Sequence, residues 1–169
     1  MKQYIKLKSA LLILIIMVFP ACDGGLEPPV IIEEEITYIA GQIGYISGLE
    51  SWPGSDSVNA VRVVAFMDYP PKSIFEDLSS GKAFYTDTLA TYAETDSFRL
   101  EFDTPPLTIK YLVVALQWGT NPLADWMAIG VYTLNGDPAK PTEIELTTGT
   151  HAESTNIEVD FNNLPPQPF

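Results

Sequence analysis

Few residues of this sequence have the types and the spacing that catalysis requires. The one histidine, His151, stands two positions before Glu153 in a polar stretch, so this carboxylate could orient it as a general base. The simpler interpretation is a solvated histidine in a loop. Acidic residues are plentiful, so a carboxylate-dependent hydrolase stays open as an alternative, but no spacing marks a pair. We therefore expect no catalytic residue and a protein that is not an enzyme.

Residues that bind metals are not arranged in a recognisable motif either. One histidine and one cysteine are too few for a zinc site. The loop aspartates Asp56, Asp87 and Asp96 supply the oxygen ligands that calcium prefers. None of them has the spacing of a twelve-residue calcium loop, and aspartates in turns often cap the backbone instead. We therefore expect no metal and no cofactor.

Aromatic side chains are the stronger indication of a binding surface. Trp52 lies in a turn-rich segment, and Trp118 and Trp126 flank a second loop. Tryptophan at a loop edge can stack on a sugar ring or anchor a protein partner. This favours a binding module with a protein or glycan partner. The alternatives are a structural component of the envelope and a carbohydrate-binding module that uses these tryptophans as platforms. The competing interpretation is that all three close the ends of a hydrophobic core.

The elements that position these residues begin after an N-terminal segment with the features of an export signal. Lys2, Lys6 and Lys8 precede an apolar run of about 10 residues, from Ala10 to Phe19. A helix that spans a membrane needs roughly 20 apolar residues, so the run is too short for a permanent span. An exported chain with one cysteine forms no internal disulfide.

The block Phe19-Pro20-Ala21-Cys22 resembles the lipobox of bacterial lipoproteins. The resemblance implies that residues 1–21 are a signal peptide and that the Cys22 thiol receives a diacylglyceryl group before cleavage. Fatty acids such as palmitate on Cys22 would then anchor the chain to a membrane of the bacterial envelope, facing the periplasm or on the cell surface. Two or three acyl chains anchor a protein stably where one is marginal. The alternative is an ordinary signal peptide with a chance cysteine.

The net charge of the predicted mature chain argues against some classes of binding partner. Removal of residues 1–21 leaves 148 residues, a length that suits one domain. Three of the nine basic residues leave with the signal, so six face 22 acidic ones and the net charge becomes −16. Nucleic acid repels such a chain, and we exclude it as a partner. Residues 22–35 contain adjacent glycines, prolines and glutamates, which predicts a lipid-attached, flexible tether.

After residue 35 the hydrophobic pattern is that of β-strands. Val61–Met67 and Ile109–Leu116 are nearly continuous apolar runs, typical of internal strands covered on both faces. Phe98, Leu100 and Phe102 alternate with polar residues, which predicts a half-buried strand. Turn signals at short intervals separate about seven or eight such strands, so the pattern predicts an all-β protein with a single antiparallel β-sandwich.

Two local features complete this prediction. Residues 72–80 have apolar residues at helical spacing and are followed by Gly81, which predicts one or two helical turns. Gly41 and Gly44 lie inside the first strand, where glycine marks a bulge or a close approach of backbone. The predicted domain covers residues 36–162, and residues 163–169 form a proline-rich tail that we expect to be frayed.

Residues 38–118 contain several motifs in an order that is also found in a known protein family. A strand flanked by glycines leads to Val61–Phe66, and Thr95–Leu100 and Lys110–Ala115 follow. This succession resembles the carboxypeptidase regulatory-like, transthyretin-like β-sandwich. The resemblance implies a transthyretin-like or Ig-like arrangement of strands. Because such modules are mostly non-catalytic attachments of exported bacterial proteins, it implies no activity.

Overall fold

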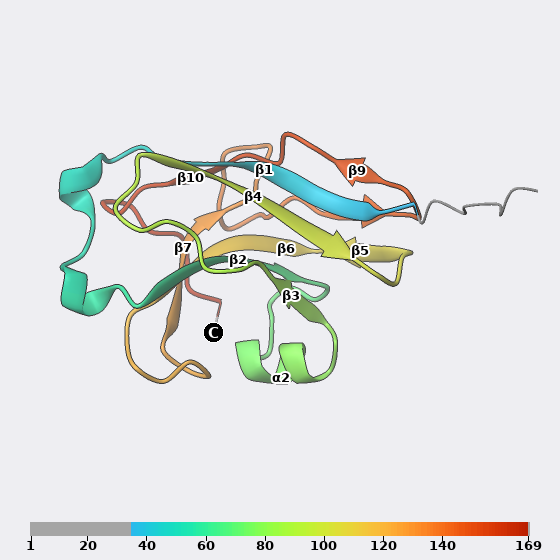
Figure 1. Cartoon of the computed structure of the whole chain (residues 1–169), viewed down its shortest axis with the longest axis horizontal. Helices are drawn as coiled ribbons and strands as arrows, with labels where there is room; N and C mark the ends of the chain where they lie inside the picture. Colours follow the sequence, from blue (N-terminus) through green and yellow to red (C-terminus); the bar gives the residue numbers. More distant parts are fainter. Residues whose placement is uncertain (1–34, 169) are drawn as a thin grey trace, which may run out of the picture. The chain divides into compact units, whose positions relative to one another are not determined.

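Two four-stranded β-sheets lie face to face in the computed structural model, which describes residues 35–168 (Figure 1). The predicted signal peptide, Cys22 and most of the predicted tether lie outside these residues. Within them, no helix has both the length and the apolar character needed to cross a membrane. The prediction of an all-β sandwich is confirmed.

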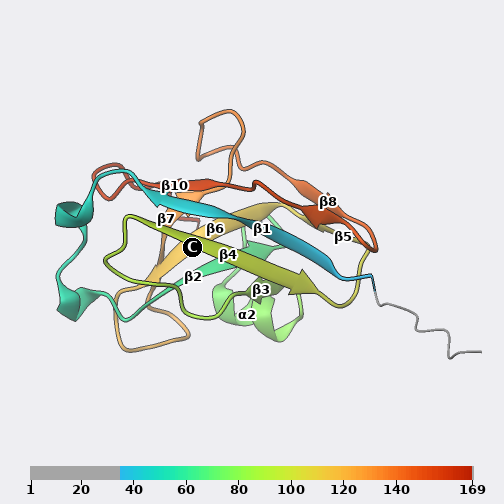
Figure 2. The same cartoon turned by 45° about the horizontal axis from the view of Figure 1, so that its top comes forward.

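The first sheet has the order β10-β1-β4 (Figure 2), and β9, labelled in Figure 1, is also paired to β1. Its strands are β1 (Thr37–Tyr45), β4 (Thr95–Phe102), β9 (His151–Ala152) and β10 (Ile157–Val159). The β1–β4 pair is antiparallel, whereas β9 and β10 run parallel to β1. This sheet is therefore mixed, where the sequence pattern predicted antiparallel strands throughout.

The second sheet is fully antiparallel and has the order β3-β2-β6-β7. Its strands are β2 (Ala60–Phe66), β3 (Ala83–Tyr85), β6 (Tyr111–Gln117) and β7 (Trp126–Val131). A small third sheet joins β5 (Leu107–Ile109) to β8 (Ile144–Leu146). The described residues thus form ten strands. The predicted strand with the apolar run Ile109–Leu116 divides into β5 and β6, and β9 lies in the polar stretch around His151 that the sequence indicated to be a loop.

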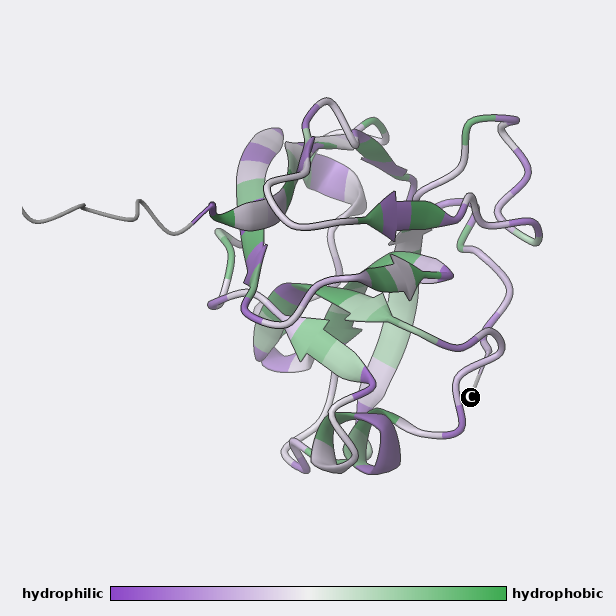
Figure 3. Ribbon diagram, turned by 90° about the vertical axis from the view of Figure 1, so that its right-hand side faces the viewer, coloured by the Kyte–Doolittle hydropathy of each residue, from purple (hydrophilic) through white to green (hydrophobic). Residues whose placement is uncertain are grey.

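Burial explains why the second sheet has nearly continuous apolar strands. Val61, Val63 and Ala65 of β2 pack in the core between the sheets, while Val64 and Phe66 pack on the outer face. The helix α2 (Ile74–Ser79) covers part of that outer face. Apolar residues therefore predominate on the strands and polar residues on the connections (Figure 3).

The short helix α2 confirms the prediction for residues 72–80. The Ser73 hydroxyl accepts a hydrogen bond from the Glu76 N–H (3.1 Å), which satisfies one of the free donors of the first turn. The buried Asp77 carboxylate accepts a hydrogen bond from the Lys72 N–H (2.9 Å) and ties the helix to the preceding segment. Gly81, with a φ of 71°, provides the left-handed turn after the helix. Two 3₁₀ turns, η1 (Leu49–Ser51) and η2 (Ser55–Ser57), lie between β1 and β2.

The C-terminal tail contacts the sandwich, where the sequence predicted a frayed end. The Gln167 side-chain amide accepts a hydrogen bond from the Ala128 N–H (2.8 Å) and donates one to the Ala128 carbonyl (3.0 Å). Pro165 is buried. Because β7 is an edge strand, these contacts occupy backbone groups that an edge otherwise leaves open to another chain.

Candidate functional site

A groove opens where the edge strands of the two large sheets meet. At Gly130 of β7, a Cβ atom would lie 2.7 Å from the Glu158 carbonyl oxygen and 2.8 Å from Val159 Cγ2. Such distances are too short for a side chain, so glycine allows β10 to approach β7 directly. Beside this contact the surface is hollowed by a groove of about 480 Å³.

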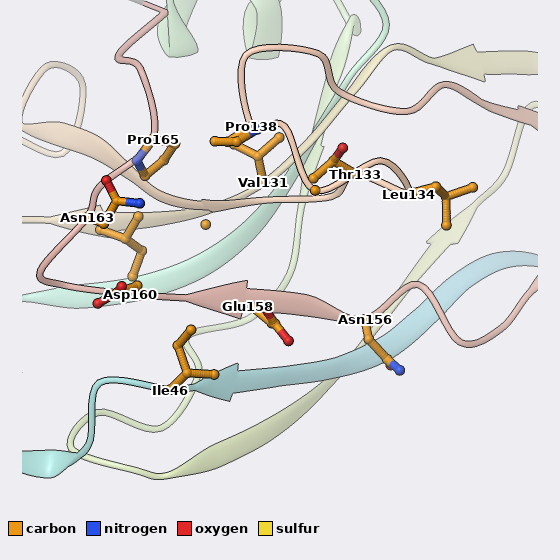
Figure 4. A pocket seen from close by; sticks show the side chains of 13 residues that line it. Ile46, Val131, Thr133, Leu134, Pro138, Asn156, Glu158, Asp160, Asn163 and Pro165 are labelled. Atoms are coloured by element: carbon orange, nitrogen blue, oxygen red, sulfur yellow. The ribbon is translucent and has the colours of Figure 1, made fainter.

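Two segments that are distant in the sequence line this groove. Residues 131–138 lie along one side, residues 156–160 along the other, and Asn163 and Pro165 lie at one end (Figure 4). The apolar lining is Ile46, Ile129, Val131, Leu134, Pro138 and Pro165. The polar lining is Thr133, Asn156, Glu158, Asp160 and Asn163. The groove therefore combines an apolar surface with carboxylate, amide and hydroxyl groups, a mixture typical of sites that bind a ligand by contact.

Hydrogen bonds hold part of the polar lining in place. The Asn156 side-chain oxygen accepts a hydrogen bond from the Gln42 N–H of β1 (3.0 Å), and Asp160 accepts one from the Asn162 N–H (2.9 Å). The ion pairs among residues 35–168 are Lys82–Asp68, Arg99–Glu101 and Lys140–Asp137. No lysine or arginine lines the groove, so its two carboxylates give it a negative potential.

The three tryptophans do not form one binding surface. Trp52 is only 7% exposed and packs against Tyr45 and Phe161, with ring centroids 4.6 and 4.8 Å apart. It therefore belongs to the core, as the competing interpretation holds, and the proposal of Trp52 as a platform is wrong. Trp118 is 52% exposed. Trp126 is half-buried and donates a hydrogen bond from its indole N–H to the Pro122 carbonyl (2.8 Å).

His151 has a packing role in this structure. Its ring stacks on Tyr38 at 4.4 Å between centroids, and the guanidinium carbon of Arg99 lies 3.7 Å from the centroid of the same tyrosine ring. The Tyr38 hydroxyl donates a hydrogen bond to the Glu153 carboxylate (2.7 Å), which raises the pKa of Tyr38. Glu153 thus binds Tyr38, and the arrangement in which it orients His151 as a base does not occur.

Two of the three aspartates considered as calcium ligands accept hydrogen bonds from nearby residues, and one of these, Asp96, lies in β4 and not in a loop as predicted. Asp96 accepts hydrogen bonds from the N–H groups of Ala90 (2.8 Å) and Ser97 (2.7 Å). Asp56 accepts one from the Ser57 hydroxyl (3.3 Å). In residues 35–168, no group of three or more histidine, cysteine, aspartate or glutamate side chains is arranged to hold a metal ion.

The sequence did not predict the groove, although one local pattern bears on its lining. Asn156, Glu158 and Asp160 alternate with apolar residues, which predicts that they share one polar face of the last strand, and all three line the groove. Their meeting with residues 131–138 depends on the parallel placement of β10 beside β1 and on its contact with Gly130. No local pattern records either feature.

The fold defines the chain as an all-β sandwich protein. Comparison with models of protein families, with curated proteins and with solved structures gives no match for this chain. The lipobox and the transthyretin-like resemblance therefore remain predictions from the sequence.

Proposed function

We propose that the protein is a non-catalytic lipoprotein of the bacterial envelope, anchored through Cys22, which binds a protein or glycan partner in the groove between β7 and β10. The groove is the observation that supports this most directly, because it is open, of ligand size, and lined by both apolar and polar groups. The N-terminal lipobox-like block supports the anchor.

Strand pairing fixes part of the groove wall, which favours binding over a purely structural role. Glu158 belongs to β10, which is paired with β1 along its whole length, and residues 129–131 belong to β7, which is paired with β6, while residues 132–138 follow β7 as a loop. A ligand that enters a preformed site loses less free energy to the ordering of loops than one that must fold its own site. The polar lining can accept hydrogen bonds from the N–H groups of a peptide or from the hydroxyls of a sugar.

Photo-crosslinking in cells tests the groove directly. A crosslinking amino acid at position 134, where the side chain is 77% exposed and lines the groove, is expected to yield a discrete adduct with the partner. The substitution Glu158→Arg is expected to reduce that adduct roughly tenfold, the equivalent of about 1.4 kcal/mol, because it reverses a charge on the rim. Adduct yield on gels of whole envelopes is the measurement.

The small third sheet supplies matched controls for this experiment. Glu145 of β8 is exposed and does not line the groove. A crosslinker at position 145 should give no adduct, and Glu145→Arg should leave the adduct from position 134 unchanged. Equal adducts from both positions, or an adduct that survives Glu158→Arg, would show that the partner binds elsewhere.

A carbohydrate-binding module is the second candidate, and the exposure of Trp118 favours it. An indole that is 52% exposed offers a stacking surface for a sugar ring. Trp118→Ala is then expected to abolish the retardation of the protein in gels that contain the polysaccharide it binds, while Trp118→Phe retains most of it. If no polysaccharide of a bacterial or host surface retards the wild-type chain, this candidate is excluded.

A further inference from the structure

A second, smaller pocket lies on the outer face of the sheet β3-β2-β6-β7 and shares no residue with the groove. It has a volume of about 250 Å³. Its apolar lining is Val64, Ile74, Leu78, Leu123 and Trp126. Arg62, Tyr85 and Gln117 contribute the polar groups. Nothing in the proposed function uses this pocket.

The pocket exists because two separate elements cover this face of the sheet and leave a gap. On one side α2 contributes Ile74 and Leu78, and its first turn is fixed by the Ser73 cap. On the other side the loop after β6 contributes Leu123, and the hydrogen bond from Trp126 to Pro122 holds the indole against this loop. Both walls are thus braced, and the pocket is preformed.

A guanidinium group stands at this apolar pocket. Arg62 lies over the ring of Tyr85, 5.1 Å from its centroid, and donates a hydrogen bond to the Thr86 carbonyl. These two contacts orient the guanidinium, and none of the ion pairs among residues 35–168 includes it. Because a guanidinium has five N–H donors in a planar fork, it can pair with a carboxylate in a bidentate manner.

The lining of the pocket contains one cation and no carboxylate, which favours an anion over a cation as its ligand. Residues 35–168 contain 18 acidic and six basic side chains. Four of the basic ones belong to the second sheet or to the segments that lead into α2, β3 and β6: Arg62, Lys72, Lys82 and Lys110. Lys82 is already paired with Asp68 (2.7 Å), and Arg62 is the one basic side chain that lines the pocket itself.

We propose that this pocket binds a free, short amphipathic anion, such as a medium-chain fatty acid, with the chain among Leu78, Leu123 and Trp126 and the carboxylate on Arg62. Pockets for drug-sized ligands measure roughly 300–1,000 Å³, so this smaller volume suits a short alkyl chain or one ring. Leu123, Tyr85 and the neighbouring Phe75 are each more than half exposed, which gives the chain an apolar entrance.

Three probes with the same ten-carbon chain separate the contribution of charge from that of apolar contact. Sodium decanoate, 1-decanol and decyltrimethylammonium are added to the full chain with Cys22→Ser, which cannot carry acyl groups of its own that would compete. The NMR signal of the Trp126 indole N–H reports on the pocket, because this indole lines it. Decanoate is expected to shift this signal and to bind at least tenfold more tightly than the cationic probe.

Two substitutions test the two halves of the site. Arg62→Gln is expected to weaken decanoate about tenfold and to leave decanol unchanged, whereas Leu123→Asp weakens both. Leu134→Asp is the matched control, since Leu134 is also exposed but lines the other groove. Equal binding of the anionic and cationic probes, an unmoved Trp126 signal, or equal effects of Leu123→Asp and Leu134→Asp would overturn the proposal. The comparison of probes uses unsubstituted pocket residues, so it stands even where Arg62→Gln impairs folding.

Discussion

Replacement of Cys22 by serine is expected to abolish lipid attachment and, because acylation precedes cleavage, to leave residues 1–21 on the chain. If the cysteine carries a diacylglyceryl group and an acylated amine, it inserts two or three acyl chains, each buried methylene contributing about 0.8 kcal/mol. A serine hydroxyl receives no such group, so the membrane affinity that the acyl chains supply is lost. Labelling of cells with a radioactive fatty acid measures the effect: the wild-type chain incorporates the label and enters a detergent phase, whereas the variant incorporates no label.

Mass spectrometry of the mature N-terminus makes this test specific. The wild-type peptide should begin at Cys22 and carry the mass of the acyl groups. Asp23→Asn, a substitution one residue further on, leaves the lipobox-like block unchanged and should partition like the wild type. A wild-type chain that is cleaved elsewhere or remains in the aqueous phase would refute the anchor, while the inference about the groove would stand, because it rests on residues 46–165 alone.

The fold class follows from the sequence because strand burial leaves a periodic record. In β4 the residues that alternate as apolar, Phe98, Leu100 and Phe102, are the ones buried against the core. In β6 six successive residues are buried, since one face packs in the sandwich and the other lies under α2 and its neighbours. The periodicity of apolar residues indicates which faces of a strand are covered, and the structure confirms the predicted burial of both strands.

No local pattern in the sequence shows which element covers each face of a sheet or which strands are neighbours. β9 contains two residues, too few for any periodicity, and its place beside β1 depends on contacts more than 100 positions away in the sequence. The burial of Trp52 depends in the same way on Phe161, which a distant part of the chain supplies. The groove could not be predicted for the same reason, because its lining combines residues 131–138 with residues 156–165.

Gly41→Ala is expected to reduce the free energy of unfolding by about 3 kcal/mol, because the added methyl group would overlap backbone atoms. A Cβ atom at position 41 would overlap the Thr155 carbonyl oxygen and would lie 2.6 Å from the carbonyl carbon. These are backbone atoms, so no rotamer change relieves the overlap. Thr155 is also buried and fixed by two hydrogen bonds to the Ala40 carbonyl, from its N–H (3.1 Å) and its hydroxyl (2.7 Å). Denaturation with urea measures the change.

A second glycine of β1, Gly44, provides a control for the contact between position 41 and Thr155. Gly44→Ala adds the same methyl group where no atom lies within 4 Å, so its effect should stay within about 0.5 kcal/mol of zero. Because Thr155 leads directly into β10, Gly41→Ala should also displace the groove rim at Glu158 and lower the crosslink from position 134, whereas Gly44→Ala should not. If both variants are equally stable, the segment with Thr155 does not pass beside β1, and the parallel pairing that builds the groove is wrong.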